Sequence, residues 1–243
     1  MKDTNKTNRK TRDAIYLAVI GVLILALATT IFLPKILKRG DEPDYYTLKC
    51  ESFAVQNSNL AKGQIVFIGD SITDLCPLDS YYAELPLASY NRGIAGDTTA
   101  GVLDRLDVSA FDLEPSKIVL MIGTNDVNGS DSVAEIAKRY DEIIKKLTAA
   151  LPNTEIFCMS VIPENEDLES YTEIVVANTS RRILELNVQI EEIANRYGAT
   201  YVNIYPLLAD ENDRLIRAYS DDGIHLNSLG FAVWAELITP YLA

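Results

Sequence analysis

Three side chains have the types and the spacing that serine-dependent ester hydrolysis requires. Ser71 follows a short apolar run in the segment Gly-Asp-Ser-Ile-Thr, and Asp222 and His225 lie three residues apart in a polar segment near the end of the chain. This spacing lets one tight loop hold the carboxylate against the imidazole, where it would fix the tautomer and stabilise the imidazolium. The pattern predicts Ser71 as the nucleophile, His225 as the base and Asp222 as the orienting acid.

Two further polar segments have groups that could donate hydrogen bonds to an oxyanion. Gly96 lies in Gly-Ile-Ala-Gly-Asp-Thr-Thr, where a residue without a Cβ can bring its backbone N–H close to a ligand. Asn125 lies in Gly-Thr-Asn-Asp and offers a side-chain amide. Each segment taken alone is more typical of an ordinary turn or helix cap. Together with the backbone N–H of Ser71, however, they make a candidate oxyanion hole.

The segments that must position these residues alternate between strand-like and helix-like patterns. Short apolar or mixed runs predict strands within residues 65–69, 88–96, 117–123, 155–163 and 200–206. Helical periodicity and caps predict helices over residues 131–150, 175–197 and 227–241. This alternation predicts an α/β fold with a parallel sheet covered by helices on both faces. Functional groups of such sheets gather at the carboxyl ends of the strands, which is where Ser71, Gly96 and Asn125 fall.

In chain order, these are the segments that hold Ser71, Gly96, Asn125 and the pair Asp222 and His225, and together they resemble the SGNH (GDSL) hydrolase family over residues 63–243. The resemblance implies a flavodoxin-like α/β/α sandwich with a five-stranded parallel sheet. It also implies an esterase or lipase that needs no metal or cofactor, in which Ser71 attacks an acyl carbon. The implied oxyanion hole consists of the backbone N–H groups of Ser71 and Gly96 and the side chain of Asn125.

Composition excludes several other classes of function. The chain of 243 residues has a net charge of −13, which divides into +6 for residues 1–40 and −19 for residues 41–243. A body this acidic repels phosphate backbones, so we expect no nucleic-acid partner. One histidine and three cysteines without metal-ligand spacing predict no metal site. Cys158 is expected to be buried, and a disulfide between Cys50 and Cys76 is left open.

Residues 14–33 form an apolar run without a charged residue. Twenty helical residues span roughly 30 Å, the thickness of a bilayer core, so we expect a transmembrane signal anchor. Residues 1–13 are basic and are expected in the cytoplasm, which makes this a single-pass protein of the cell membrane with an extracytoplasmic body. A cleaved signal peptide is the alternative, because residues 26–28 are a tolerable cleavage site. Residues 34–62 are expected to be a tether and lead-in.

These expectations combine into a membrane-anchored serine esterase that hydrolyses short acyl esters on carbohydrate or cell-wall glycans. A lysophospholipase or lipase is the alternative within the enzyme class, because the anchor would hold the site near lipid. A non-catalytic glycan-binding module at the cell surface is the alternative from another class. Such a module would have no need of Ser71, Asp222 and His225 together. An acyltransferase that uses the same serine is also left open.

Overall fold

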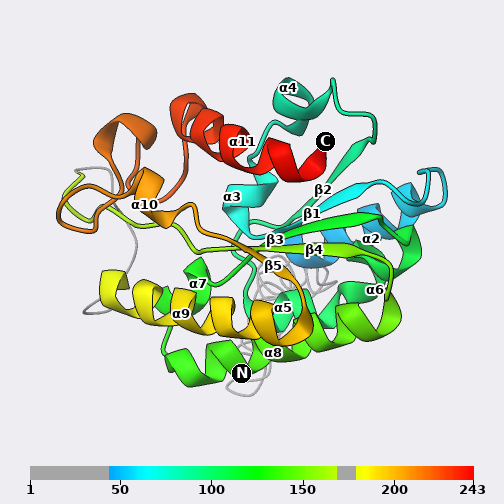
Figure 1. Ribbon diagram of the computed structural model, residues 1–243, viewed down its shortest axis with the longest axis horizontal. Helices are drawn as coiled ribbons and strands as arrows, with labels where there is room; N and C mark the ends of the chain where they lie inside the picture. The colour runs from blue at the N-terminus through cyan, green and yellow to red at the C-terminus, as the bar shows by residue number, and fades with distance from the viewer. Residues whose placement is uncertain (1–43, 169–178) are drawn as a thin grey trace, which may run out of the picture. The chain divides into compact units, whose positions relative to one another are not determined.

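Five short segments form a parallel sheet at the centre of the fold (Figure 1). The computed structural model describes residues 44–168 and 179–243, and residues Tyr45–Ala243 make one compact unit. The strands are β1 (Ile65–Gly69), β2 (Ser89–Gly93), β3 (Lys117–Met121), β4 (Glu155–Met159) and β5 (Thr200–Val202). Each lies inside a segment that the sequence predicts as a strand.

The strand order β2-β1-β3-β4-β5 is that of flavodoxin-like folds. The first strand pairs with β2 on one side, with Ile65 opposite Ser89, and with β3 on the other, with Ile65 opposite Lys117. Because all pairs are parallel, the carboxyl ends of β1, β2 and β3 meet at one edge of the sheet. The prediction of a five-stranded parallel sheet is confirmed.

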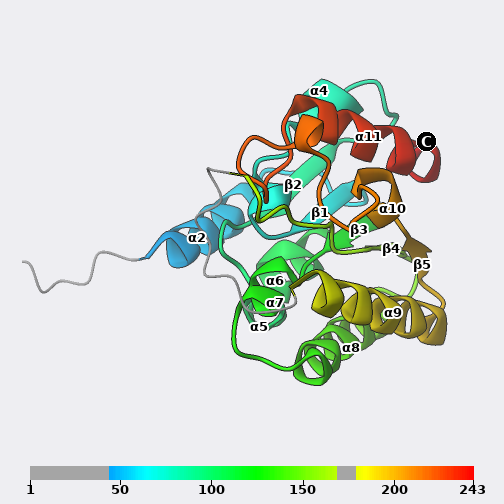
Figure 2. The same ribbon diagram turned by 90° about the vertical axis from the view of Figure 1, so that its left-hand side faces the viewer.

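Helices cover both faces of this sheet (Figures 1 and 2). They are α2 (Tyr45–Asn57), α3 (Ser71–Asp74), α4 (Leu78–Tyr82), α5 (Thr99–Asp104), α6 (Leu106–Ser109), α7 (Thr124–Asn128), α8 (Val133–Ala150), α9 (Thr179–Tyr197), α10 (Tyr205–Leu208) and α11 (Ser228–Leu242). Two 3-10 turns, η1 (Phe111–Leu113) and η2 (Arg217–Tyr219), complete the described elements.

Alternate residues of β1 point to opposite faces, as the two-residue period of a strand requires. Val66 and Ile68 belong to the apolar core under α8 and α9, whereas Ile65 and Phe67 belong to the core under α4 and α11. All four side chains are fully buried. Burial on both sides explains why this strand appears in the sequence as an uninterrupted apolar run.

The long helices begin at residues that cap them. Ser132 and Glu135 form a capping box at the start of α8, and the Asn227 side chain accepts hydrogen bonds from Leu229 N and Gly230 N at the start of α11. The predicted helices over 131–150 and 227–241 are confirmed. The predicted helix over 175–197 is confirmed from Thr179 onward, and residues 175–178 lie outside the described part of the chain.

The amino-terminal part is expected from its sequence to hold a membrane anchor followed by a tether. The tether expected over residues 34–62 is wrong for residues 45–57, which form α2. This helix buries only Phe53 fully and exposes Leu48 and Val55, so its apolar pattern is weak. The expected cytoplasmic segment and membrane anchor lie outside the described residues. Within those residues, no helix is both long and apolar enough to cross a membrane.

The cysteines contribute to packing. Cys158 is fully buried, as expected from its apolar segment, and Cys76 is a buried free thiol. The disulfide between Cys50 and Cys76 that the sequence leaves open is therefore not formed.

Candidate active site

Ser71 lies at the first turn of α3, directly after β1. Asp70 caps this helix, since its Oδ1 accepts a hydrogen bond from Ile72 N at 3.0 Å. Gly69 permits the sharp turn, because a Cβ at this position would lie 2.1 Å from Thr73 Oγ1 and 2.4 Å from the backbone oxygen of Met121. The segment Gly-Asp-Ser thus supplies a tight turn, a helix cap and a partly exposed hydroxyl, in that order.

The imidazole of His225 connects Ser71 to Asp222. His225 Nε2 lies 2.8 Å from Ser71 Oγ, and His225 Nδ1 lies 2.7 Å from Asp222 Oδ2. An ionised carboxylate can only accept hydrogen bonds, so the proton of the neutral ring lies on Nδ1. Nε2 is then left as an acceptor for the Ser71 hydroxyl.

The loop before α11 holds Asp222 in place. Its Oδ1 accepts hydrogen bonds from Ile224 N at 2.9 Å and from His225 N at 2.8 Å, and Ser220 Oγ donates to it at 3.3 Å. Partial burial acts to raise the pKa of Asp222, but the hydrogen bonds from His225 and Ile224 outweigh it and hold the pKa below its ordinary value. Asp222 is therefore an anion at neutral pH.

Gly96 and Asn125 lie together at the ends of β2 and β3. Gly96 is exposed and has a φ of +80°, a left-handed conformation that favours glycine. Asn125, in the first turn of α7, donates one amide hydrogen to the backbone oxygen of Asp97 at 2.8 Å. Within the described part of the chain the other amide hydrogen has no partner, which leaves it for a ligand. The loop of residues 94–97 lies against α3, because Ala95 N donates to Asp74 Oδ2 at 3.2 Å.

A buried ion pair beneath this loop is not predicted by any pattern in the sequence. Arg105 Nε lies 2.7 Å from Asp97 Oδ2, and both side chains are almost completely buried. The same guanidinium donates to the backbone oxygens of Gly69 at 3.0 Å and Arg92 at 2.8 Å. Arg105 therefore ties the end of β1, which carries Ser71, to the end of β2, which carries the loop. Residues this far apart in sequence give no local pattern that would have revealed the contact.

Asp70 is the second buried carboxyl group near Ser71. It is fully buried, and its Oδ2 has no hydrogen-bond partner among the described residues. Burial raises the pKa of Asp70 to about 7, although the hydrogen bond from Ile72 N opposes this shift. A large fraction of Asp70 is therefore protonated at neutral pH, which reduces the negative charge next to the nucleophile.

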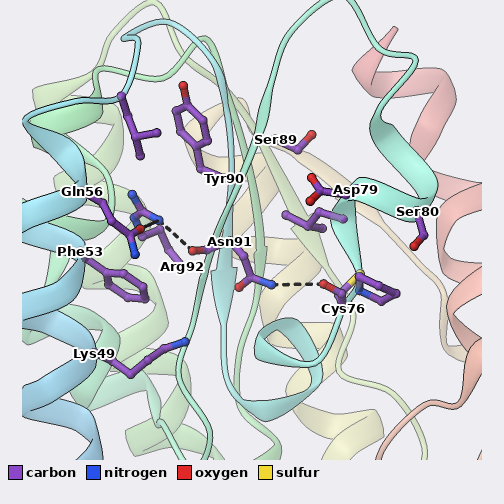
Figure 3. Close-up of a pocket in the computed structure, with 13 residues that line it drawn as sticks. Lys49, Phe53, Gln56, Cys76, Asp79, Ser80, Ser89, Tyr90, Asn91 and Arg92 are labelled. Carbon is purple, nitrogen blue, oxygen red and sulfur yellow. Dashed lines mark hydrogen bonds between the residues drawn. The ribbon is translucent and has the colours of Figure 1, made fainter.

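No group of three or more histidine, cysteine, aspartate or glutamate side chains is placed to hold a metal ion within residues 44–168 and 179–243. A cavity of about 600 Å³ is lined by residues of α2, β2 and α4 (Figure 3). None of the five predicted site residues lines it. At the carboxyl edge of the sheet, Ser71 and His225 are partly exposed and Gly96 is exposed.

A serine, an imidazole and a carboxylate linked in this order, beside amide donors at the end of a parallel sheet, define the class of α/β serine hydrolases. Residues 67–233 match the sequence model of the GDSL-like Lipase/Acylhydrolase family. The chain therefore belongs to this family. The resemblance drawn from the four motifs is confirmed, and a non-catalytic binding module is not supported.

Two of the relatives are subunits of the same mammalian enzyme. The chain is 32% identical over 105 residues to the alpha2 subunit of rat (Rattus norvegicus) platelet-activating factor acetylhydrolase IB, covering 42% of this chain and 45% of that protein. It is 26% identical over 185 residues to the rat alpha1 subunit, covering 73% of this chain and 74% of that protein. The chain thus matches only about half the length of the alpha2 relatives.

A solved structure extends the similarity to nearly the whole fold. A protein from Streptococcus pneumoniae, provisionally described as a platelet activating factor, is 29% identical, with a TM-score of 0.76. The match covers 90% of this chain and 99% of that one. The similarity therefore includes elements beyond the four motif segments.

Proposed function

We propose that the chain hydrolyses carboxylic esters through Ser71, His225 and Asp222. Ser71 Oγ attacks the acyl carbon while His225 Nε2 takes its proton, and Asp222 stabilises the resulting imidazolium. The oxyanion receives hydrogen bonds from the backbone N–H groups of Ser71 and Gly96 and from the Asn125 amide. His225 then gives its proton to the leaving alcohol, and water releases the acyl group in a second cycle. The contact of 2.8 Å between Ser71 Oγ and His225 Nε2 carries this proposal.

The test is the hydrolysis of p-nitrophenyl acetate by the Ser71→Ala variant. Loss of the nucleophile is expected to lower kcat by several orders of magnitude, with an unchanged fold. Ser80→Ala is the matched control, because Ser80 is exposed on α4. Activity of Ser71→Ala equal to that of the control would refute the assignment.

For the acyl group we infer a short chain. Among the described residues, the exposed large apolar side chains within four positions of Ser71 or His225 are Leu75 and Leu229. Two such side chains offer little surface for a long alkyl chain. The names of the two rat relatives, acetylhydrolases, point in the same direction. Acetyl and butyryl esters are expected to give a higher kcat/KM than palmitoyl esters, and the reverse order would refute this inference.

For the group that carries the acyl ester, we propose carbohydrate or cell-wall glycans. The polar and partly exposed side chains of Ser71, Asn125 and His225 support this choice, because they suit hydroxyl-rich substrates better than alkyl chains. An acetylated phospholipid is the second candidate, favoured by the names of the relatives. The two are separated by comparing kcat/KM for acetylated oligosaccharides with kcat/KM for a short-chain sn-2 acetyl phospholipid.

For location, we propose a single-pass protein anchored through residues 14–33, with the catalytic domain outside the cytoplasm. The uncharged apolar run and the basic residues before it support this proposal. The protein is expected to remain in the membrane fraction after carbonate washing, while external protease digests the domain. A released form that begins near residue 29 would instead indicate a cleaved signal peptide.

A further inference from the structure

Asp74 connects the nucleophile helix to the loop that carries Gly96. It is the last residue of α3, three positions after Ser71, and its side chain is only 15% exposed. Its carboxylate accepts three hydrogen bonds: from Ala95 N at 3.2 Å, from Tyr45 Oη at 2.7 Å and from Lys49 Nζ at 2.7 Å. One carboxylate thus joins α3, the loop of residues 94–97 and helix α2.

The contact with Ala95 bears directly on the candidate oxyanion hole. Ala95 immediately precedes Gly96, so fixing its N–H restricts the peptide unit that leads into the Gly96 N–H. On the far side the same loop is held by Asn125 and Arg105, which bind the backbone oxygen and the carboxylate of Asp97. Asp74 therefore completes the support of the loop from the side of the nucleophile.

The carboxylate also brings a charge that needs compensation. An uncompensated anion within hydrogen-bond distance of this loop would oppose the negative charge that develops on the substrate oxygen. Lys49 lies in contact with Asp74 and makes the pair neutral. Tyr45 and Lys49 are four residues apart on α2, so both side chains reach Asp74 from one face of the helix.

Helix α2 is well placed to hold these two side chains still. Phe53 is buried, and the guanidinium of Arg92 lies 4.6 Å from the centre of its ring (Figure 3). Arg92 also donates to Gln56 Oε1 at 3.3 Å, which fixes the helix to β2. At the other end of the helix, Tyr46 Oη donates to the backbone oxygen of Gly101 on α5 at 2.8 Å. The helix is thus anchored at both ends.

We propose that α2 is a positioning element of the active site, in which Tyr45 and Lys49 hold and neutralise Asp74 while Asp74 fixes the Ile94–Ala95 peptide that precedes Gly96. Tyr45, Lys49 and Asp74 are positioning residues that act through the oxyanion loop, residues 94–97. The proposal rests on the function proposed above. It assigns a positioning role to a helix that lies outside residues 67–233, the part that matches the family.

The test is steady-state hydrolysis of p-nitrophenyl acetate by full-length variants. Lys49→Met leaves the Asp74 carboxylate uncompensated and is expected to lower kcat about tenfold with little change in KM, the size of one screened charge interaction. Adding Asp74→Asn to Lys49→Met removes the uncompensated charge and keeps an acceptor for Ala95 N–H. The double variant is therefore expected to recover most of kcat.

Two further variants separate a positioning role from a loss of folding. Lys62→Met removes a lysine of the same kind from an exposed ion pair with Glu114 and is expected to leave kcat unchanged. Tyr45→Phe deletes a single oxygen from a residue that is 51% exposed, so it is expected to fold like the parent and lower kcat about two- to fivefold, as expected for one lost hydrogen bond.

Three outcomes would overturn the proposal, and none of them depends on a change at Ser71. An unchanged kcat in Lys49→Met, a change confined to KM, or a double variant no faster than Lys49→Met would each overturn it. Because all these variants retain Ser71, the result is independent of Ser71→Ala. An active Ser71→Ala enzyme would overturn the proposed function instead.

Discussion

Replacing Asp222 by asparagine gives the sharpest test of how the candidate triad works. The loop is expected to survive, because the asparagine side chain keeps an oxygen able to accept from Ile224 N and His225 N, as Asp222 Oδ1 does. The oxygen Asp222 Oδ2, which lies 2.7 Å from His225 Nδ1, would be replaced by an amide NH₂. Because an amide NH₂ can only donate, His225 Nδ1 would have to accept its hydrogen bond, and the ring proton would move to Nε2. Nε2 then cannot accept the proton of Ser71.

The size of the effect has two contributions. A charge pair 4 Å apart is worth roughly 1 kcal/mol in water and roughly 4 kcal/mol at an effective dielectric of 20. The His225 and Asp222 side chains are 32% and 41% exposed, so stabilisation of the imidazolium falls between these limits. This charge alone accounts for about 5- to 10³-fold in rate, at about 1.36 kcal/mol per factor of ten. The wrong tautomer adds to it, and we expect a total loss of about 10⁴, as in another serine triad.

The assay is kcat/KM for p-nitrophenyl acetate between pH 5 and 9, with Asp222→Ala measured alongside. Alanine removes the charge but leaves the tautomer free, so Asp222→Asn is expected to be slower than Asp222→Ala. The low pKa of Asp222 keeps it ionised over this range, so the parent retains the negative charge that both variants lack. More than a tenth of parental activity in Asp222→Asn, or Asp222→Ala as the slower variant, would show that Asp222 holds the loop and does not set the tautomer.

Three further predictions concern the groups around the triad. Asn125→Ala should lower kcat by roughly 10²–10³ with a smaller change in KM, because the amide binds the oxyanion more strongly than the ground-state carbonyl; a change in KM alone would contradict this. Arg105→Met leaves Asp97 buried without its partner and should lower the free energy of unfolding by about 3–5 kcal/mol in urea titrations, and a loss below about 1 kcal/mol would contradict it. The pKa of Asp70 rises from 3.8 to about 7 on folding, so the folded state binds a proton that the unfolded state releases, and stability should fall as pH increases between these values. Asp70→Asn should reduce that slope in unfolding midpoints measured from pH 4 to 8.

The central strands could be predicted from the sequence because they are buried on both faces. Residues such as Val66 and Phe67 point to opposite cores, so β1 has no polar face to interrupt its apolar run. The edge strand β2 has no such uninterrupted apolar run, because it is not buried on both faces. It pairs only with β1, and Ser89, Tyr90 and Asn91 are partly exposed, so it carries polar residues.

The triad residues could be predicted because their chemistry is rare and their spacing is local. Asp222 and His225 are within one loop, and Ser71 follows a strand whose end is predictable. Arg105 and helix α2 could not be predicted in the same way. The partners of Arg105 come from three different segments, and α2 is held by single contacts, such as Phe53 against Arg92, and not by a periodic apolar face.

The net charge of −19 over residues 41–243 is an apparent obstacle to a reaction that develops negative charge, and the structure shows how it is overcome locally. Three carboxylates in or next to the motif segments each contact a cation: Asp74 with Lys49, Asp97 with Arg105 and Asp126 with Arg139. The fourth, Asp70, has its charge reduced by burial. Asp222 alone faces the imidazole, where a negative charge assists the transfer of the serine proton. The acidic surface is thus compatible with catalysis, because each carboxylate near the oxyanion loop has its own compensating group. Removing any one of the three cations should therefore lower kcat more than removing a single positive charge from the outer surface.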